Sequence, residues 1–444
     1  MSQTYVTYDN RTMVIEDAEH VRNFSTIADI PIKELKGEDS GQGLLVFPDD
    51  FSKYGDEIGG ECLFSLKANS GEEKDSYSLI TGNIMGFIGV GDTMLKIRSR
   101  FDEGREDYFM HYMLERVLSI NLFDLNHSRS QEEIFDFLPF LFPYYLKKAM
   151  AQGLYKEYRT FERNDANMRG VLDVSRHIRL NYPATGKIAF KSREHTADNA
   201  LTQLIRHTIE VIKVKEFGSK ILSCDEDTKA FVSQITLATA TYSKAERQKV
   251  IHKNLRQKVH PYYSEYTPLS KLCMQILRNE ELKYGNDKDK IYGVVFDGAW
   301  LWEEYLDTFI SKPCDLEHPR NRTGEKALYL FEGRKGPCVP DFMGDGIIID
   351  AKYKGYDSKS VSDIQREDRF QVISYMYITQ AKTGAIIFPS KENKTHYDRA
   401  TLHGYGGTMH LLGLPISVAD NYADFTREME QNERILIETI ASSK

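Results

Sequence analysis

Three charged side chains in the C-terminal part of the sequence have the types and spacing to bind a divalent cation. Asp341 follows a proline, and eight residues separate it from the run Asp350, Ala351 and Lys352. The apolar residues 347–349 predict a buried strand that ends at Asp350, and a hairpin would bring Asp341 beside that end. Two carboxylates, the carbonyl of Ala351 and water molecules suit Mg²⁺, which prefers oxygen ligands in octahedral geometry. Alternate residues of a strand share a face, so Lys352 would lie next to the cation.

Lys352 completes a set that could hydrolyse a phosphodiester bond. Its ammonium, beside a metal-bound water, would help to deprotonate or orient that water for attack on phosphorus, while the metal neutralises charge that develops on the phosphate. This is the pattern of the PD-(D/E)xK nucleases. A short match of this kind also occurs by chance. In the alternative interpretation, Asp341 lies in a turn, and Asp350 and Lys352 form an exposed ion pair without a metal.

The helix predicted after this strand supplies a further polar pair. Gln371 and Tyr375 are four residues apart and therefore share one face of that helix. A QxxxY pair at this place lies beside the metal site in several nucleases of this type, which favours a site role for Gln371.

An upstream helix, predicted over Asp297–Ile310, carries two adjacent acids. Apolar residues flank Glu303 at helical spacing, so this acid is expected to face the core and to need a partner, such as the metal or Lys352. We therefore predict a site role for Glu303, and Glu304 is the less favoured candidate.

The pattern along the chain predicts an α/β protein of several domains. Residues 1–105 are β-rich and include a hairpin over 77–101 with its turn at 91–92. Residues 106–265 have helical periodicity and form a mainly helical middle region. Residues 266–444 alternate helix and strand, which favours a restriction-endonuclease-like α/β domain with a central mixed sheet.

Length and composition are those of an ordinary globular protein. The 444 residues are 41% apolar and 28% charged, and no stretch approaches 18 apolar residues, so a membrane-spanning helix is not expected. The N-terminus lacks the features of a secretory signal, and the five cysteines form no CxxC pair. We therefore expect a cytoplasmic protein with reduced thiols and no zinc site.

The charge pattern bears on partners. A net charge of -8 does not suit a chain that binds DNA by non-specific electrostatic attraction to phosphates, so a partner is expected to provide much of the DNA binding. The segment Glu246–His260 is an exception, with five Lys or Arg against one acid. It is either a solvated helix face or a contact with nucleic acid or a partner. The glycines form no GxxxxGK[ST] loop, so any nucleotide hydrolysis would belong to a partner.

From about residue 75 the chain resembles McrC, the nuclease subunit of McrBC-type restriction systems. The matching landmarks, in order, are MGFIGVGDTMLKIRSRF, MRGVLDVSRHIRLN, REHTADNALTQLIRHTIEVI, YYSEYTPLSKLCMQIL, LWEEY, VPDF, IIIDAKYK, FQVISYMY and GAIIFPS. The resemblance implies Mg²⁺-dependent cutting of double-stranded DNA by Asp341, Asp350 and Lys352, with Glu303 and Gln371 in support. It also implies a partner, the hexameric AAA+ GTPase McrB, which the N-terminal and middle segments would contact and whose hydrolysis the chain would stimulate.

Two other functions fit the same residues. A stand-alone PD-(D/E)xK nuclease of repair or recombination would cut DNA without a partner or nucleotide. A non-catalytic activator of the GTPase would bind no metal, although the intact set of two acids and a lysine argues against a decayed site.

Overall fold

The computed structural model describes residues 3–35, 43–48, 60–69, 76–90, 93–102, 107–118, 133–215, 218–255, 259–282, 291–319, 326–404 and 406–443. The chain divides into two compact units: a composite unit of Met1–Asn126 with Asp287–Lys444, and a middle unit of His127–Asn286. None of the described helices is long and apolar enough to cross a membrane.

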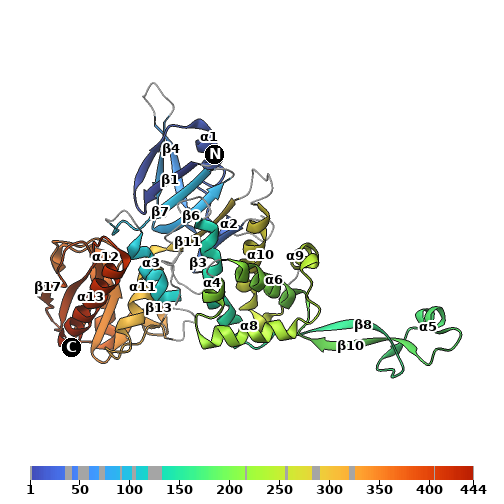
Figure 1. Ribbon diagram of the computed structural model, residues 1–444. Helices are drawn as coiled ribbons and strands as arrows, with labels where there is room; N and C mark the ends of the chain where they lie inside the picture. Colours follow the sequence, from blue (N-terminus) through green and yellow to red (C-terminus); the bar gives the residue numbers. More distant parts are fainter. Residues whose placement is uncertain are drawn as a thin grey trace. The chain divides into compact units, whose positions relative to one another are not determined.

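Two β-sheets form the N-terminal part of the composite unit (Figure 1). One has the order β1-β7-β6-β11-β3 and the other β2-β5-β4. A single apolar core lies between them, because residues of both sheets, such as Leu79, Ile88 and Leu95, are buried in one cluster. The strands are β1 (Gln3–Tyr8), β2 (Thr12–Ile15), β3 (Gly43–Phe47), β4 (Phe64–Ala68), β5 (Tyr77–Thr81), β6 (Ile84–Val90), β7 (Thr93–Arg98) and β11 (Ile291–Asp297), and the helices are α1 (Ala18–Ser25) and α2 (Ile32–Leu35).

The predicted hairpin within residues 77–101 is confirmed by β6 and β7, which pair antiparallel with Val90 opposite Thr93. Leu95 and Ile97 of β7 are buried, as their alternation with basic residues predicts. The predicted turn at 91–92 lies outside the described residues. Strand β5, in contrast, belongs to the second sheet and pairs with β2 and β4.

Strand β11 comes from the segment that was predicted as the nuclease domain, yet it is a central strand of the N-terminal sheet. It pairs antiparallel with β6 and parallel with β3. Two glycines allow this pairing to be close: a Cβ on Gly86 would lie 2.2 Å from the Val294 carbonyl oxygen, and one on Gly293 would lie 2.2 Å from that of Phe87. The N-terminal and C-terminal parts of the chain therefore share a sheet.

The C-terminal part contains the predicted mixed sheet, with the order β14-β15-β16-β18-β17. Strands β15, β16 and β18 are parallel, and β14 and β17 are antiparallel edge strands. Helix α12 packs on one face through Val372 and Met376, which contact Ile348, Ile386 and other apolar side chains. The elements are α11 (Gly298–Ile310), β12 (Leu328–Phe331), β13 (Lys335–Cys338), β14 (Phe342–Gly344), β15 (Ile347–Ala351), α12 (Arg366–Thr379), β16 (Thr383–Ser390), β17 (His396–Thr401), β18 (Thr408–Pro415) and α13 (Tyr422–Ser443).

A buried carboxylate joins three helices of this unit. Glu433 of α13 accepts hydrogen bonds from Tyr112 at 2.9 Å and Tyr305 at 2.7 Å, and its other oxygen pairs with Arg116 at 2.7 Å. Burial raises the pKa of Glu433, and the Arg116 guanidinium acts in the opposite direction. Helix α3 (Tyr108–Leu118) therefore packs with α11 and α13, although it lies in the segment predicted as the middle region.

The middle unit is a helical body from which a two-stranded ribbon extends (Figure 1). Strands β8 and β10 pair antiparallel along their whole length, and helix α5 lies in the connection between them. The elements are α4 (Glu133–Ala151), β8 (Glu157–Asp165), β9 (Val171–Leu172), α5 (Val174–Asn181), β10 (Ile188–Thr196), α6 (Ala200–Val214), α7 (Gly218–Leu222), α8 (Glu226–Ala238), α9 (Arg247–Asn254) and α10 (Tyr266–Leu282).

Most of the basic segment Glu246–His260 is described, and its residues Arg247–Asn254 form α9. Val250 and Ile251 are buried and α9 packs on α6, while Lys249 and Lys253 are exposed. The described part thus has the amphipathic pattern of a surface helix. Residues 256–258 lie outside the described residues.

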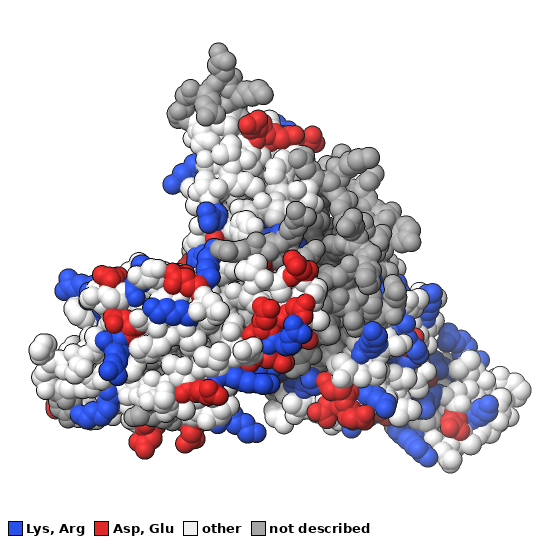
Figure 2. Space-filling model, turned by 60° about the vertical axis from the view of Figure 1, so that its left-hand side comes forward, with Lys and Arg blue, Asp and Glu red and all other residues white. Residues whose placement is uncertain are grey.

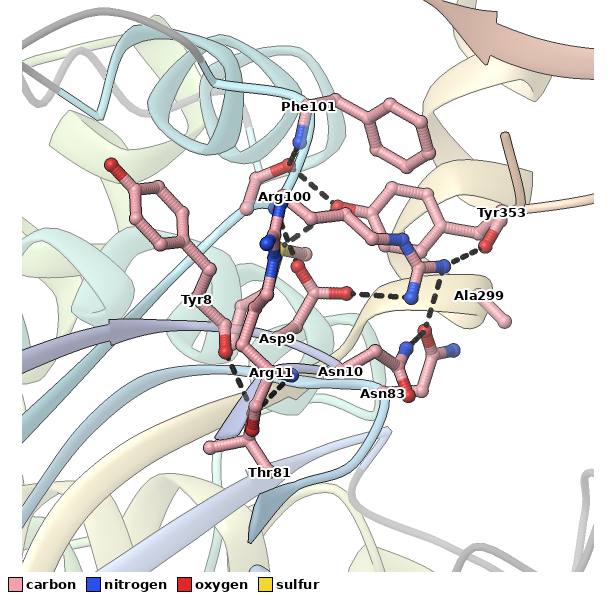
Figure 3. A network of polar contacts seen from close by, with 12 residues as sticks. Tyr8, Asp9, Asn10, Arg11, Thr81, Asn83, Arg100, Phe101, Ala299 and Tyr353 are labelled. Carbon is pink, nitrogen blue, oxygen red and sulfur yellow. Dashed lines mark hydrogen bonds and ion pairs between the residues drawn. The ribbon is translucent and has the colours of Figure 1, made fainter. Parts of the chain in front are cut away.

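At the ends of β1 and β7, Asp9 and Arg100 form a buried ion pair (Figure 3). One Asp9 oxygen accepts from the Arg100 main-chain N–H at 2.5 Å, and the other lies 3.2 Å from the guanidinium. Burial raises the pKa of Asp9 to about 6, and Arg100 limits that rise. The parallel pairing of β1 with β7 brings these two residues together.

The pKa of Asp9 predicts a pH-dependent stability difference between the protein and its D9N variant. The folded state favours protonated Asp9, so this stabilisation is complete below the ordinary pKa of 3.8 and is lost as the pH rises through about 6. Between pH 4 and 7 the wild type should lose about 2 kcal/mol relative to D9N, in which position 9 stays neutral. Urea unfolding of both proteins at each pH measures this, and parallel curves would contradict it.

Candidate active site

The hairpin of β14 and β15 brings the two predicted carboxylates to one edge of the C-terminal sheet. Phe342 pairs with Ile349, so Asp341 and Asp350 are the next residues on the two strands. Asp341 Oδ2 accepts a hydrogen bond from the Ala351 main-chain N–H at 2.7 Å. Asp350 is 1% exposed and lies at the carboxyl end of the buried strand. Both acids therefore lie where β15 leaves the sheet.

Lys352 lies between Asp350 and the following helix. Its Nζ is 2.8 Å from Asp350 Oδ2 and donates to Gln371 Oε1 at 3.1 Å. Burial alone would lower the pKa of Lys352, but Asp350 and Asp341 outweigh burial and raise that pKa above its usual value. Lys352 is consequently an ammonium at neutral pH. It suits the orientation of water and the stabilisation of negative charge better than the acceptance of a proton.

Burial raises the pKa of Asp350, the acid paired with Lys352, while the neighbouring Lys352 ammonium lowers that pKa. The carboxylate oxygens of Asp350 are buried, and neither accepts a geometrically regular hydrogen bond. A buried carboxylate that relies on one cation has capacity for a second positive ligand.

Gln371 and Tyr375 lie on the face of α12 that points to this edge. Gln371 accepts from Lys352 through its oxygen and donates through its nitrogen to the Tyr375 hydroxyl at 2.8 Å. Tyr375 in turn donates to the Val339 carbonyl, two residues before Asp341, at 3.2 Å. The predicted pair thus connects the lysine to the segment that leads into the first acid.

On α11 the buried acid is Glu304, not Glu303 as expected from the apolar spacing. Glu304 is 8% exposed and Glu303 is half-buried. Glu304 Oε1 lies 3.9 Å from Nε2 of His318, whose Nδ1 is 2.6 Å from the Asp341 carbonyl oxygen. The His318 ring stacks on Phe342 with centroids 4.7 Å apart. Glu304 therefore reaches the first acid through His318, while the predicted site role of Glu303 stays a prediction.

A second charged cluster beside the site was not predicted. Asp368 Oδ1 lies 4.0 Å from Lys352 Nζ, and Asp368 Oδ2 lies 2.9 Å from Lys354 Nζ. Burial alone would raise the pKa of Asp368, but the Tyr356 hydroxyl and the two lysines lower it. The signal in the sequence was the alternation of Lys352 and Lys354, which in an extended chain share a side.

The donors at the strand edge fit a hard cation. Within the described residues no group of three or more His, Cys, Asp or Glu side chains is arranged to hold a metal ion. The predicted set consists instead of two carboxylates, Asp341 and Asp350, with the carbonyl of Ala351 as the predicted third donor. Mg²⁺ commonly takes one or two carboxylates and completes its shell with water, whereas zinc prefers nitrogen and sulfur.

A family model identifies the family of this chain. The family model described as McrBC 5-methylcytosine restriction system component matches residues 79–389. One similar solved structure is a refined half-complex from a tetradecameric assembly of Thermococcus gammatolerans McrB AAA+ hexamers with bound McrC; it is 15% identical, the match covers 99% of this chain and 100% of that chain, and the TM-score is 0.48. Another is the Thermococcus gammatolerans McrBC complex, at 14% identity, 70% and 88% coverage and a TM-score of 0.33. No curated protein matches the chain.

Proposed function

Because the chain belongs to the McrBC 5-methylcytosine restriction system component family, we propose that it is the nuclease subunit of a McrBC-like restriction complex. In this role it is a Mg²⁺-dependent endodeoxyribonuclease that cuts phosphodiester bonds of double-stranded DNA. The observation that carries the proposal is the meeting of Asp341, Asp350, Lys352 and Gln371 at the end of β15.

In the proposed reaction each residue has a separate task. Asp341, Asp350 and the Ala351 carbonyl would hold the cation, which when bound would supply Lewis-acid activation of water and neutralisation of charge on the phosphate. Lys352, as an ammonium, donates to the attacking water or to a phosphate oxygen. Gln371 accepts from Lys352 and so holds its flexible chain at the site.

The proposed partner is a McrB-like AAA+ GTPase hexamer, whose hydrolysis the chain stimulates. The chain has no phosphate loop of the GxxxxGK[ST] type. Among the described residues on the face that Figure 2 shows, most Lys and Arg are interspersed with Asp and Glu. Both observations favour a chain that cuts DNA held and moved by a partner.

The proposed contact with that partner is the tip of the ribbon in the middle unit. Large apolar side chains are exposed there: Met168, Val171, Leu172, Val174, Ile178, Leu180 and Tyr182. Clustered exposed apolar residues mark protein interaction sites, because their burial against a partner removes them from water.

Reconstitution tests the proposal. The purified chain, mixed with a cognate AAA+ GTPase, GTP and plasmid DNA, should linearise the DNA with Mg²⁺, and EDTA should stop cleavage. Cleavage by the chain alone without nucleotide would favour a stand-alone nuclease instead. Stimulated GTP hydrolysis with no cleavage under any metal would favour a non-catalytic activator.

A further inference from the structure

Tyr353, the residue after Lys352, contacts the N-terminal sheet and the segment that follows it, not the C-terminal sheet to which β15 belongs (Figure 3). The hydroxyl of Tyr353 lies 2.6 Å from Ser99 Oγ and donates to Met85 Sδ at 3.3 Å. Its main-chain carbonyl accepts from the Arg100 guanidinium, which also lies 4.9 Å from the centre of the Tyr353 ring. Tyr353 is 3% exposed. Both ends of this residue are therefore fixed by the segment that follows β7.

Arg100 is itself fixed, so it provides a firm anchor. The buried Asp9 carboxylate contacts both its main-chain N–H and its guanidinium. The Phe101 ring meets the Tyr353 ring edge to face, with centroids 5.0 Å apart. The first residue of α11, Gly298, leaves room for Tyr353, because a Cβ there would lie 2.7 Å from the Tyr353 ring. The pocket is thus built from both sequence regions of the composite unit.

The contacts of Tyr353 begin where the pairing of β15 with its neighbouring strands ends. Strand β14 pairs with β15 only as far as Ile349, and β16 pairs with it as far as Ala351. The last sheet hydrogen bond runs from the Lys352 main-chain N–H to Ile387 at 2.9 Å. Beyond it, Tyr353 is the next fixed residue. Neighbouring residues of an extended chain point to opposite sides, so burial of Tyr353 directs Lys352 toward the acids.

We propose that Arg100 and Tyr353 are positioning residues for Lys352: through them the N-terminal sheet fixes the chain beyond the catalytic strand and aims the Lys352 ammonium at Asp350. Neither residue touches the proposed cation or phosphate. The consequence for cleavage rests on the proposed function, while the effect on the position of Lys352 does not. A lysine needs such support, because its four-carbon side chain is flexible and small displacements of a catalytic group are costly.

The R100K variant tests this proposal, with R98K as its matched control. Arg98 and Arg100 each pair with a buried aspartate, and replacement by lysine keeps the charge of either residue. The two differ because Arg98 pairs with Asp107 and does not contact Tyr353. Acylation by an amine-reactive reagent at one fixed pH, read by peptide mass spectrometry, reports how firmly Lys352 is paired. The exposed Lys229 serves as internal reference.

Lys352 should be acylated several-fold faster in R100K than in wild type or R98K. In the complex with partner, Mg²⁺ and GTP, R100K should lower the kcat of DNA cleavage about tenfold without changing the KM for DNA.

Unchanged acylation of Lys352 in folded R100K would overturn the proposal. If R100K does not fold, Y353F decides, because it removes the hydroxyl contacts and keeps the ring and carbonyl. A wild-type chain that cuts no DNA would remove the proposed function, and the acylation result would still decide the positioning.

Discussion

Replacement of Asp350 by asparagine is expected to reduce Mg²⁺-dependent DNA cleavage by about a thousandfold or more. Asparagine has nearly the same shape but carries no negative charge, and it can offer a cation one oxygen instead of a carboxylate. Because Asp350 is buried at the end of β15 and pairs with Lys352, the change also leaves the ammonium without its closest acid. Gel assays of plasmid linearisation by the reconstituted complex measure the loss.

The same variant should leave the stimulation of the partner GTPase unchanged, since Asp350 lies in the composite unit and the proposed partner contact lies on the ribbon. A suitable control is D345N, because Asp345 is an exposed acid at the turn of the same hairpin, away from the strand end. D345N should cut DNA like the wild type. Cleavage by D350N at the rate of D345N would remove Asp350 from the site.

The hairpin at the candidate site was predictable because its signals are local. The run Ile347–Ile349 is apolar without interruption, as expected for a strand buried on both faces of a parallel sheet. Gly346, in the turn that precedes β15, has a φ of 72°, and this left-handed backbone conformation favours glycine. The match of the family model confirms the McrC-type resemblance, which rested on short motifs in a fixed order.

The orientation of α11 was not predictable from spacing. The helix buries Trp300, Leu301, Trp302, Tyr305 and Leu306, which surround its axis. When a helix is apolar on most sides, periodicity does not identify the face that meets the site. Glu304 lies 3.9 Å from His318, which follows it by more than ten residues and has no sequence pattern of its own, so this contact could not be predicted either.

Long-range strand pairing was equally hidden. The segment Ile291–Asp297 has the apolar character of any buried strand, and nothing local in it indicates that it pairs with β6 on one side and β3 on the other. The ribbon strand β8 alternates between exposed and half-buried residues and has no apolar face. Such a strand gives a weak signal within a region of strong helical periodicity.

The second large effect is expected at the ribbon tip, where the variant V174S/I178S should weaken the complex with the AAA+ partner. Val174 and Ile178 are one helical turn apart on α5 and are 57% and 61% exposed. Apolar residues at the centre of an interface each contribute about 2 kcal/mol or more, so their joint loss should weaken binding at least a hundredfold. Fluorescence anisotropy or calorimetry with the partner hexamer and a non-hydrolysable GTP analogue measures the change.

A matched control separates this effect from a general loss of apolar surface. Leu237 on α8 is 82% exposed and belongs to the helical body of the middle unit. The variant L237S therefore removes a comparable side chain away from the tip and should bind like the wild type. Since the exposed positions of α5 bear little on stability, the double variant should unfold at the wild-type temperature and still bind Mg²⁺ in calorimetry. Equal affinities of V174S/I178S and L237S for the partner would show that the tip is not the contact, and the apolar residues there would need another ligand.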